Sequence, residues 1–126
     1  KNNEDYAGIR GQNITGLAVT TDTGYIKYRV HVGSGWLDFI DSRNTDINDY
    51  YNGYAGNDTP VDAVEIYYYT PDDIITSSGY HYAFYWVSPV NNNYYSPQKD
   101  NSTDNGMDGY AGIFGHFIDR IQINIR

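Results

Sequence analysis

The chain has 126 residues, a length that allows one domain, or two very small domains that share a core. Its 16 acidic and 8 basic residues give a formal net charge of −8, which argues against binding to nucleic acid or to anionic membrane surfaces. The absence of cysteine excludes disulfides and thiol chemistry, and no apolar run is long enough to span a bilayer.

Two further features of the composition bear on function. The chain begins at Lys1 and shows no signal peptide, so we interpret it as a domain excised from a longer protein whose N-terminal neighbour is missing. Tyrosine is unusually common, with 15 residues, beside many asparagines and glycines. This composition suits a surface that stacks on sugars and hydrogen-bonds to their hydroxyl groups. It would equally follow from a β-rich fold alone, because tyrosine is a good strand former.

Alternation of apolar and polar residues predicts β-strands along the whole chain. The expected strands cover residues 14–20, 25–32, 36–40, 61–70, 80–88, 94–96 and 117–126. Two polar stretches, residues 41–57 and 98–109, indicate long loops. No segment has helical periodicity of useful length, and residues 74–79 are expected to form a simple link.

The alternation also predicts which side chains share a face of each strand. The apolar sets are Ile26, Tyr28, Val30 and Val32; Val64, Ile66 and Tyr68; and Ile121, Ile123 and Ile125. Lys27, Arg29 and His31 lie on the opposite face of their strand, and Arg120 belongs to the polar face of the last one. We therefore expect half-buried strands with one apolar face each.

One sequence pattern recurs near the start, the middle and the end of the chain. Residues 6–19 align without a gap to residues 110–123, and residues 54–66 form a third copy that is one residue shorter. Each copy begins with Tyr-Ala-Gly and continues into alternating apolar and polar residues. A repeat of this kind indicates one supersecondary unit used several times, here a glycine loop that leads into a strand.

These patterns predict an all-β fold made of two small barrel-like halves related by a pseudo-two-fold repeat. Residues 1–24 would be a lead-in with an orphan repeat strand, residues 25–73 the first unit and residues 74–126 the second. The orphan strand, residues 14–20, would complete the edge of one half, which would otherwise be exposed. The three segments together would form one domain.

No catalytic or metal site stands out among the histidines. His31 is expected to point outward beside Arg29, but no nucleophile or orienting group lies near it in sequence. The histidines at positions 31, 81 and 116 lack the spacing of metal ligands. We therefore expect no catalytic residue, no metal and no cofactor, and we assign His31 a structural or ligand-contact role.

The acidic residues allow the same interpretation. The pairs Asp38/Asp41 and Asp46/Asp49 could in principle serve glycoside hydrolysis. In loops rich in asparagine and aspartate, such residues are more often turn formers. Residues 100–106 partly match a calcium loop, but the glycine is misplaced and no glutamate closes the loop, so calcium is not expected.

The order of motifs resembles a known family. Residues 28–36 end in Gly-Trp, residues 52–56 read Asn-Gly-Tyr-Ala-Gly, residues 61–66 follow as a strand, and residues 110–123 repeat the pattern. This order resembles the C-terminal wall-targeting modules of PSA-type listerial phage endolysins and of enterolysin-type bacteriocins. It is similar, more loosely, to the clostridial hydrophobic repeats with a central Gly-Trp.

The resemblance implies two SH3-like barrels in tandem that share or exchange a terminal strand. It further implies a monomeric, non-catalytic module that binds carbohydrate of the Gram-positive cell wall and carries a peptidoglycan hydrolase to its substrate. The partners would be wall polysaccharide, or the sugar substituents of teichoic acid, and an N-terminal catalytic domain. The place of action would be the bacterial wall, reached from the host cytoplasm by a phage enzyme or by secretion of a bacteriocin.

Aromatic and polar side chains in and near the long loops are the candidate ligand contacts. The candidates are Arg29, His31, Trp36, Tyr50, Tyr51, Tyr67, Tyr69, Trp86, Tyr94 and Tyr95. Rings would stack on pyranose faces, while arginine and histidine would donate to hydroxyl groups. Trp36 could equally be a core residue, and Tyr54 and Tyr110, at a repeated position, are expected to be structural. The second unit has Tyr-Tyr in place of Gly-Trp, so its site would differ from the first.

Two other classes of function remain open at this point. A structural or protein-interaction β module would have mostly buried aromatic residues and no affinity for glycans. An enzyme would need a cleft with perturbed carboxylates, supplied by residues 41–57 and 98–109.

Overall fold

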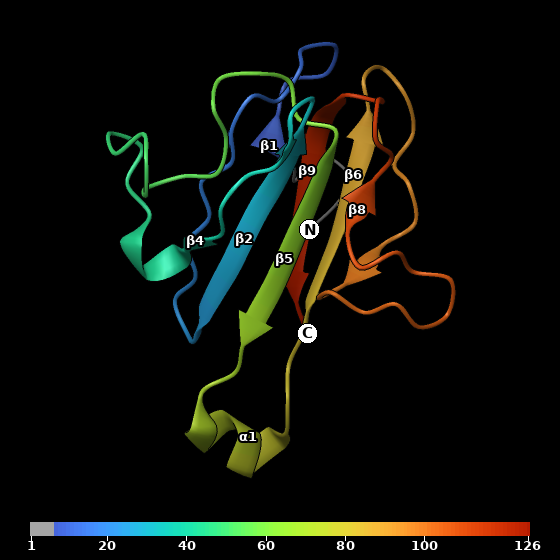
Figure 1. Cartoon of the computed structure of the whole chain (residues 1–126). Coiled ribbons are helices and arrows are strands. Elements are labelled where there is room, and N and C mark those ends of the chain that lie inside the picture. The colour runs from blue at the N-terminus through green and yellow to red at the C-terminus, as the bar shows by residue number, and fades with distance from the viewer. Residues whose placement is uncertain (1–6) are drawn as a thin grey trace.

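The structure, a computed structural model, describes residues 7–126. It consists of two antiparallel β-sheets whose buried residues form one hydrophobic cluster (Figure 1). The sheets do not close into a barrel in the described part of the chain. No helix formed by residues 7–126 has the length and the apolar character of a bilayer-spanning segment. The expected all-β class is therefore correct.

Each sheet is built around two long strands, with short strands at its edges. The first sheet contains β2 (Tyr25–Val32), β3 (Gly35–Trp36), β4 (Ile40–Asp41), β5 (Ala63–Tyr69) and β8 (Ala111–Gly112). The second contains β1 (Ala7–Gly8), β6 (Ala83–Pro89), β7 (Gln98–Lys99) and β9 (Ile118–Ile125). The first sheet has the order β3-β2-β5-β8 with β4 also on β2, and the second has the order β1-β9-β6-β7.

The four long strands match the prediction closely. The apolar sets of β2 and β5 are buried as expected, whereas in β9 only Ile121 is buried, because Ile123 is half-buried and Ile125 is 37% exposed. Tyr28 and Tyr85 are the largest fully buried side chains of the cluster. Their hydroxyl groups accept hydrogen bonds from the backbone amides of Val19 at 3.2 Å and Ile66 at 3.1 Å, so burial leaves neither hydroxyl unsatisfied. Burial also raises the pKa of the Tyr85 hydroxyl, which keeps this group a neutral hydrogen-bonding partner.

The short elements differ from the prediction. Residues 14–20 form only an isolated bridge, Leu17 to Ala55, rather than a continuous strand. The expected strand 36–40 is broken into β3 and β4, and residues 94–96 contribute a single backbone hydrogen bond, from Tyr95 to Val87, instead of a strand. These segments are at sheet edges, where few ladder bonds form.

The expected link at residues 74–79 is a helix, α1 (Asp72–Ser78), which joins β5 to β6 (Figure 1). Pro71 precedes it in an extended conformation, and Asp72 and Asp73 lie in its first turn, where carboxylates interact favourably with the helix dipole. Gly79 ends it with a φ of 88° and donates its amide to Ile75. The prediction was wrong because the helix buries no residue and so has no apolar stripe.

The three copies of the repeat meet at one point of the fold. The amide of Ile14 donates to the Ile118 carbonyl at 2.8 Å, Ile118 donates to Val61 at 3.0 Å, and Val61 donates back to Ile14 at 2.9 Å. These residues occupy equivalent positions in the three copies. The hydrogen bonds therefore close a ring, and the three copies surround a pseudo-three-fold axis rather than following the expected two-fold repeat alone.

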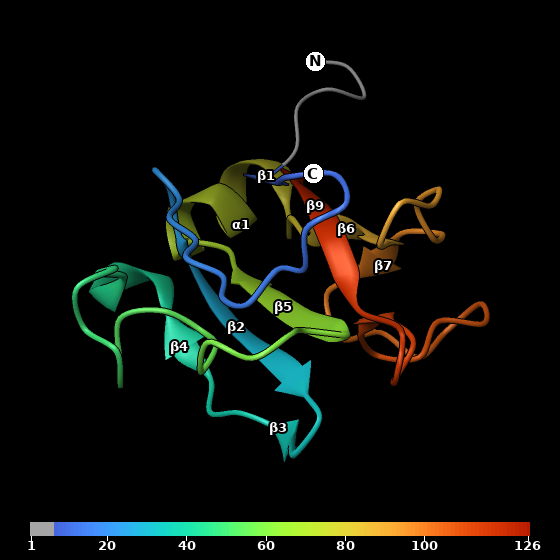
Figure 2. The same cartoon turned by 90° about the horizontal axis from the view of Figure 1, so that it is seen from above.

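The Tyr-Ala-Gly segments extend this arrangement outward from the axis. Each pairs with the strand of a different copy, through Ala7 with Ile121, Ala111 with Val64 and Ala55 with Leu17. The edge of the second sheet is thus completed by β1 rather than by the expected orphan strand, residues 14–20. β1 lies along the edge of β9, opposite Arg120 and Ile121; Figure 2 shows both strands from above.

The glycine of each Tyr-Ala-Gly segment is required by this close pairing. Gly8, Gly56 and Gly112 have φ values of 109°, 132° and 116°, which side chains rarely adopt. A Cβ on any of them would overlap the backbone carbonyl oxygen of the neighbouring copy, at Asp119, Thr15 and Asp62 respectively. The sequence repeat therefore encodes a backbone contact rather than a ligand site.

We expect the substitution Gly112→Ala to destabilise the fold by roughly 2–3 kcal/mol, because it combines a strained φ with a backbone overlap. The measurement is urea unfolding followed by tyrosine and tryptophan fluorescence. Gly33→Ala is the matched control, because Gly33 lacks a positive φ and a Cβ there would meet nothing within 4 Å. Equal effects of the two substitutions would contradict this account of the repeat.

Candidate functional site

The outward face of β2 and β5 gathers aromatic and charged side chains, and we refer to it as the aromatic face. Its members are Tyr25, Lys27 and Arg29 of β2, Glu65, Tyr67 and Tyr69 of β5, and Trp36 and Phe39 at the adjoining edge. The strand period of two places them together, since the alternate residues of both strands fill the core. Tyr67 and Tyr69, two of the candidate contacts, thus share this face with Glu65, and all three side chains are half-buried.

The tyrosines of the aromatic face form a stacked row. The rings of Tyr25 and Tyr69 stack across the two strands with centroids 4.4 Å apart and an interplanar angle of 6°. Tyr67 lies 4.9 Å from Tyr69 along β5. The guanidinium of Arg43 covers the Tyr25 ring at 3.7 Å, and the Lys27 ammonium lies 5.7 Å from the Tyr69 ring. Packing against neighbours fixes these rings before any ligand arrives, which lowers the entropy cost of binding.

At the end of the aromatic face near Trp36, Arg29 contacts Glu65 and two rings. Its Nε and Nη2 atoms donate to one carboxylate oxygen of Glu65, at 3.0 and 2.7 Å. The guanidinium carbon lies 4.4 Å from the ring centroid of Trp36 and 4.5 Å from that of Phe39. Arg29 therefore has a positioning role for two rings, in addition to any donor that it offers to a ligand.

A hollow of about 480 Å³ opens on this face. It is lined by Lys27, Phe39, Glu65, Tyr67, Tyr69 and Asn101. Three rings form its walls, and an ammonium, a carboxylate and an amide supply donors and acceptors. This combination suits a small polar molecule with flat apolar faces, of the size of one or two sugar rings.

Beside the hollow, three further rings pack into one cluster around Trp36. His31 stacks on Phe114 at 3.8 Å, Phe114 stacks on Tyr110 at 5.0 Å, and the Trp36 ring meets these three edge-on. His31 Nδ1 lies 2.6 Å from Asp62 Oδ1, and the other carboxylate oxygen of Asp62 accepts the Gly115 amide. The cluster attaches the loop after β8 to the first sheet, so His31 and Trp36 have structural contacts.

The corresponding face of the second sheet carries the same kinds of side chain in a different order. Tyr82, Phe84 and Trp86 point outward from β6, opposite Gln122, Asn124 and Arg126. Arg126 lies 5.3 Å from the Phe84 ring and 5.5 Å from the Trp86 ring, and Lys99 lies 4.0 Å from the Tyr82 ring. The two faces are equivalent in position and different in composition.

The remaining predicted residues lie elsewhere. Tyr50 and Tyr51 are in the loop after the short 3-10 helix (Ser42–Asn44), and within the described chain their ring contacts are with each other and with Tyr54. Tyr51 is 82% exposed. Tyr95 packs against the hydrophobic cluster, and Tyr94 lies under the guanidinium of Arg120 at 5.1 Å. The prediction thus combined residues from separate surfaces.

Sequence reasoning placed Lys27 on the outer face but did not name it as a candidate contact. The other residues that it did not name are Tyr25, Phe39, Asn101 and Phe114. Lys27 and Tyr25 both follow from the strand alternation that already predicted Arg29 and His31. Phe39, Asn101 and Phe114 belong to loops, whose positions depend on contacts between residues far apart in the sequence, so no local pattern indicated them.

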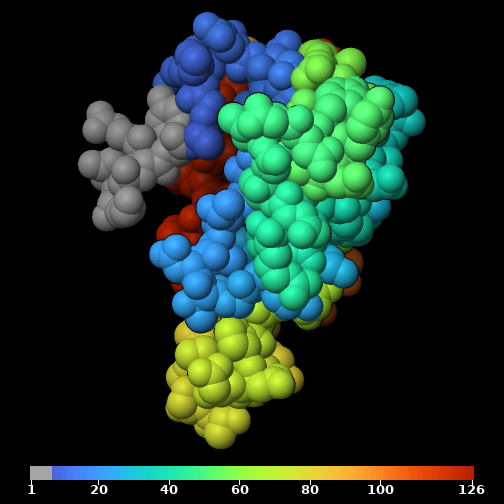
Figure 3. All heavy atoms as spheres, turned by 90° about the vertical axis from the view of Figure 1, so that its left-hand side faces the viewer, coloured from blue at the N-terminus to red at the C-terminus, as the bar shows by residue number. Residues whose placement is uncertain are grey.

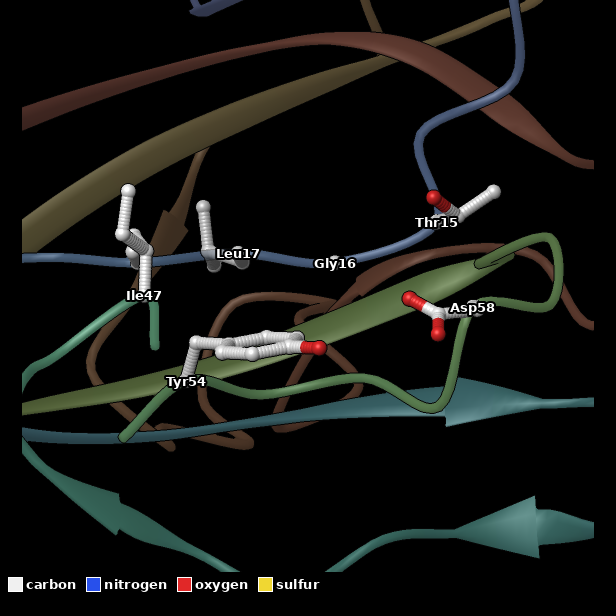
Figure 4. Close-up of a pocket in the computed structure, with 7 residues that line it drawn as sticks. Thr15, Gly16, Leu17, Ile47, Tyr54 and Asp58 are labelled. Carbon is white, nitrogen blue, oxygen red and sulfur yellow. The ribbon is translucent and has the colours of Figure 1, made fainter. Parts of the chain in front are cut away.

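A second hollow, of about 290 Å³, lies over the segment of residues 15–18 (Figure 4). The ring of Tyr54 lies beside Gly16 and Leu17, with Ile47 at one end of the hollow and Asp58 at the other (Figure 4). Burial, and to a lesser extent the nearby Asp58, raises the pKa of Tyr54. With one ring and one carboxylate, the lining of this hollow has fewer aromatic and charged side chains than the hollow on the aromatic face.

The loop carboxylates act mainly in turns. Asp46 accepts the Asn48 amide, Asp49 accepts the amides of Tyr51 and Asn52, and Asp41 caps the short helix by accepting the Arg43 amide. The side chain of Arg43, through its hydrogen bonds, lowers the pKa of the Asp41 carboxyl. These are the contacts of turn formers, in agreement with the interpretation favoured from the sequence.

The polar centre of the second sheet is the pair Asp119 and Arg120, both buried. The prediction that Arg120 lies on a solvated polar face is wrong. Asp119 accepts the amides of Gly11 and Asn91, each at 2.8 Å, and also bonds to Ser88 Oγ at 2.9 Å and to Arg120 Nε at 3.0 Å. Burial alone would raise the pKa of Asp119, but these hydrogen bonds outweigh it and hold the pKa at about 2.

A depressed pKa links this centre to acid stability. Because the Asp119 carboxyl titrates near 2 in the fold and near 4 in the unfolded chain, its charge should contribute about 2 kcal/mol above pH 4. That contribution should be lost as the pH falls from about 4 to 2. The measurement is the difference in unfolding free energy between the natural chain and Asp119→Asn across this range. A difference that does not shrink on acidification would contradict the assignment.

A comparison of the chain with protein-family models, with curated proteins and with solved structures found no match.

Proposed function

We propose that this chain is a non-catalytic carbohydrate-binding module that brings a peptidoglycan hydrolase to glycans of the Gram-positive cell wall. The observation that carries the proposal is the hollow of about 480 Å³ on the aromatic face, with its walls of Phe39, Tyr67 and Tyr69. Rings that present flat apolar faces beside a few fixed polar groups are what a pyranose ring requires, with one apolar face and a rim of hydroxyls.

The net charge of the chain restricts the class of ligand that it can bind. The net charge of −8 disfavours a polyphosphate backbone, so a teichoic acid would be bound through its sugar substituents. Lys27, Glu65 and Asn101 line the hollow and can exchange hydrogen bonds with sugar hydroxyls. The second face, around Trp86, would be a weaker and different site on the same polymer, and the two would gain affinity through avidity.

The resemblance to the wall-targeting modules also carries a finer proposal about the fold. The two sheets would correspond to two SH3-like units that exchange a strand. In support, β8 follows β7 of the second sheet in the chain and pairs with β5 of the first.

The main alternative is a β module that binds protein or spaces domains and has no affinity for glycans. That alternative expects the aromatic residues to be mostly buried. Of the rings that line the hollow, Phe39 is 43% exposed and Tyr67 and Tyr69 are half-buried on the outer face, so a ligand can reach all three, which supports the binding module.

The test is a pull-down of a fluorescent copy of residues 1–126 with a panel of purified Gram-positive cell walls. Each wall is used before and after removal of teichoic acids and accessory polysaccharides. Binding to some walls that is lost on stripping would support the proposal and identify the class of ligand. Binding to none would overturn it, and release of soluble products would contradict the non-catalytic assignment.

A further inference from the structure

The pseudo-three-fold arrangement has one position that no strand of the described chain fills. The strand of each repeat copy is flanked on one edge by a Tyr-Ala-Gly segment. On the other edge, β5 is flanked by β2 and β9 is flanked by β6. The equivalent edge of the first copy, in the segment of residues 14–20, has no strand among residues 7–126, and we refer to it as the open edge.

The backbone of the open edge is available for pairing. Leu17 exchanges both of its backbone hydrogen bonds with Ala55. Because successive residues of an extended chain face opposite edges, the amides and carbonyls of Gly16 and Ala18 point to the open edge. No hydrogen bond within residues 7–126 uses these groups. At the equivalent place in β5, Ala63 and Glu65 pair with β2.

A missing tyrosine hydroxyl marks the same position. Tyr28 and Tyr85 belong to the flanking strands, and each hydroxyl accepts the amide of an equivalent repeat residue, Val19 or Ile66. The third equivalent residue is Ile123. The ladder between β9 and β6 directs its amide away from β6, and within the described residues no hydrogen bond uses it.

The side chains beside the open edge are also less buried than their equivalents. Ile123 is half-buried whereas Ile66 is fully buried, and Ile125 is 37% exposed whereas Tyr68 is 6% exposed. Figure 3 shows the C-terminal strand, in red, at the surface beside the N-terminal segment, in blue. The edge therefore combines unpaired backbone groups with an incompletely covered apolar face.

The geometry points to the open edge as a docking site for an extended strand from outside the described residues. The strand would run antiparallel to residues 14–20 and carry the pattern Tyr-x-Val. By the register of β2 on β5, its valine would lie opposite Leu17 and its tyrosine opposite Val19, with the hydroxyl accepting the amide of Ile123. The two internal copies of this contact define the chemistry of the partner.

A second copy of the chain fits the edge less well. The Tyr-x-Val strands of the chain are β2 and β6, and both are already paired on both edges. A second copy would have to release one of them from its own sheet. The outward Lys27 and Arg29 of β2 also show that cationic residues suit the exposed side of such a strand, against a chain of charge −8.

The test uses a capped synthetic peptide with the sequence of residues 25–32, titrated into the isotope-labelled chain and followed by amide NMR. Saturable shifts at Gly16, Ala18 and Ile123 are expected. A peptide with phenylalanine in place of the tyrosine at the position of Tyr28 should bind roughly tenfold more weakly, because the Ile123 amide then has no acceptor. The variant Ala18→Pro removes one edge amide and should lose binding, whereas Ala18→Val keeps the amide and should retain it.

Unchanged amide resonances of buried residues remote from position 18 in sequence, such as Val64 and Val87, would show that Ala18→Pro is folded. Shifts confined to the aromatic face, or no shifts at millimolar peptide, would overturn the inference. So would a dimer of the chain that forms without peptide and is lost in Ala18→Pro, because the edge would then serve a second copy. None of these outcomes depends on whether the chain binds cell walls.

Discussion

The double substitution Tyr67→Ala and Tyr69→Ala should abolish binding to purified Gram-positive cell walls while the chain stays folded. Both rings line the hollow of the aromatic face and point away from the core, so their removal takes away walls of the site without opening a cavity. Truncation of aromatic residues at the centre of a binding surface typically costs about 2 kcal/mol or more each. We expect at least a 100-fold loss of affinity, measured as the amount of fluorescent chain retained on walls over a concentration series.

Tyr50 and Tyr51, which follow each other in the sequence, provide a matched control. The double substitution Tyr50→Ala and Tyr51→Ala makes the same chemical change at two exposed positions outside the hollow. We expect its affinity for walls to stay within about threefold of the natural chain. Loss of binding in this control, with retention in the Tyr67 and Tyr69 variant, would move the binding site to the loop after the short helix.

The part of the fold that could be predicted from sequence is the part that depends on local alternation. β2, β5 and β6 each have buried residues on one face and polar or aromatic residues on the other over most of their length, a pattern that specifies strand and orientation together. The same alternation placed Tyr67, Tyr69 and Arg29 on the outer face. That much of the candidate site therefore follows from the sequence.

The rest depends on pairing between distant segments. The Tyr-Ala-Gly repeat was visible, but nothing local states that Ala111 pairs with Val64 or that Ala7 pairs with Ile121. For the same reason the loop residue Asn101 could not be placed beside the β5 tyrosines. The three-fold ring of backbone bonds became apparent only when the three copies were seen together.

The buried position of Arg120 illustrates how alternation fails. It lies two residues before Gln122 and should share its solvated face, but the strand register shifts at Ser88 and Pro89, opposite this part of β9. Ser88 and Asp119 then enclose the guanidinium. A sequence pattern with a fixed period of two does not indicate such a shift.

The substitution Asp119→Ala should be the most destabilising single change in the second sheet. It would remove the carboxylate that pairs with Arg120, which is only 7% exposed, and would leave the amides of Gly11 and Asn91 without their acceptor. Breaking one partner of a buried ion pair typically costs 3–5 kcal/mol, because the remaining charge stays buried. Urea unfolding at pH 7 measures the loss. Asp119→Asn, which keeps an acceptor for the two amides, should cost less and remain measurable if the alanine variant does not fold.

The control is the same substitution in an exposed pair of the same kind. Asp41 pairs with Arg43 at 2.6 Å, but the arginine side chain is 60% exposed, so water replaces most of the interaction when it is lost. We expect Asp41→Ala to change the free energy of unfolding by no more than about 1 kcal/mol, partly through loss of the cap on the Arg43 amide. If Asp119→Ala cost no more than Asp41→Ala, the buried pair would contribute no more to stability than the exposed pair. The hydrogen bonds of Asp119 would then be a consequence of how the surrounding loops pack, and they would not be what holds those loops in place.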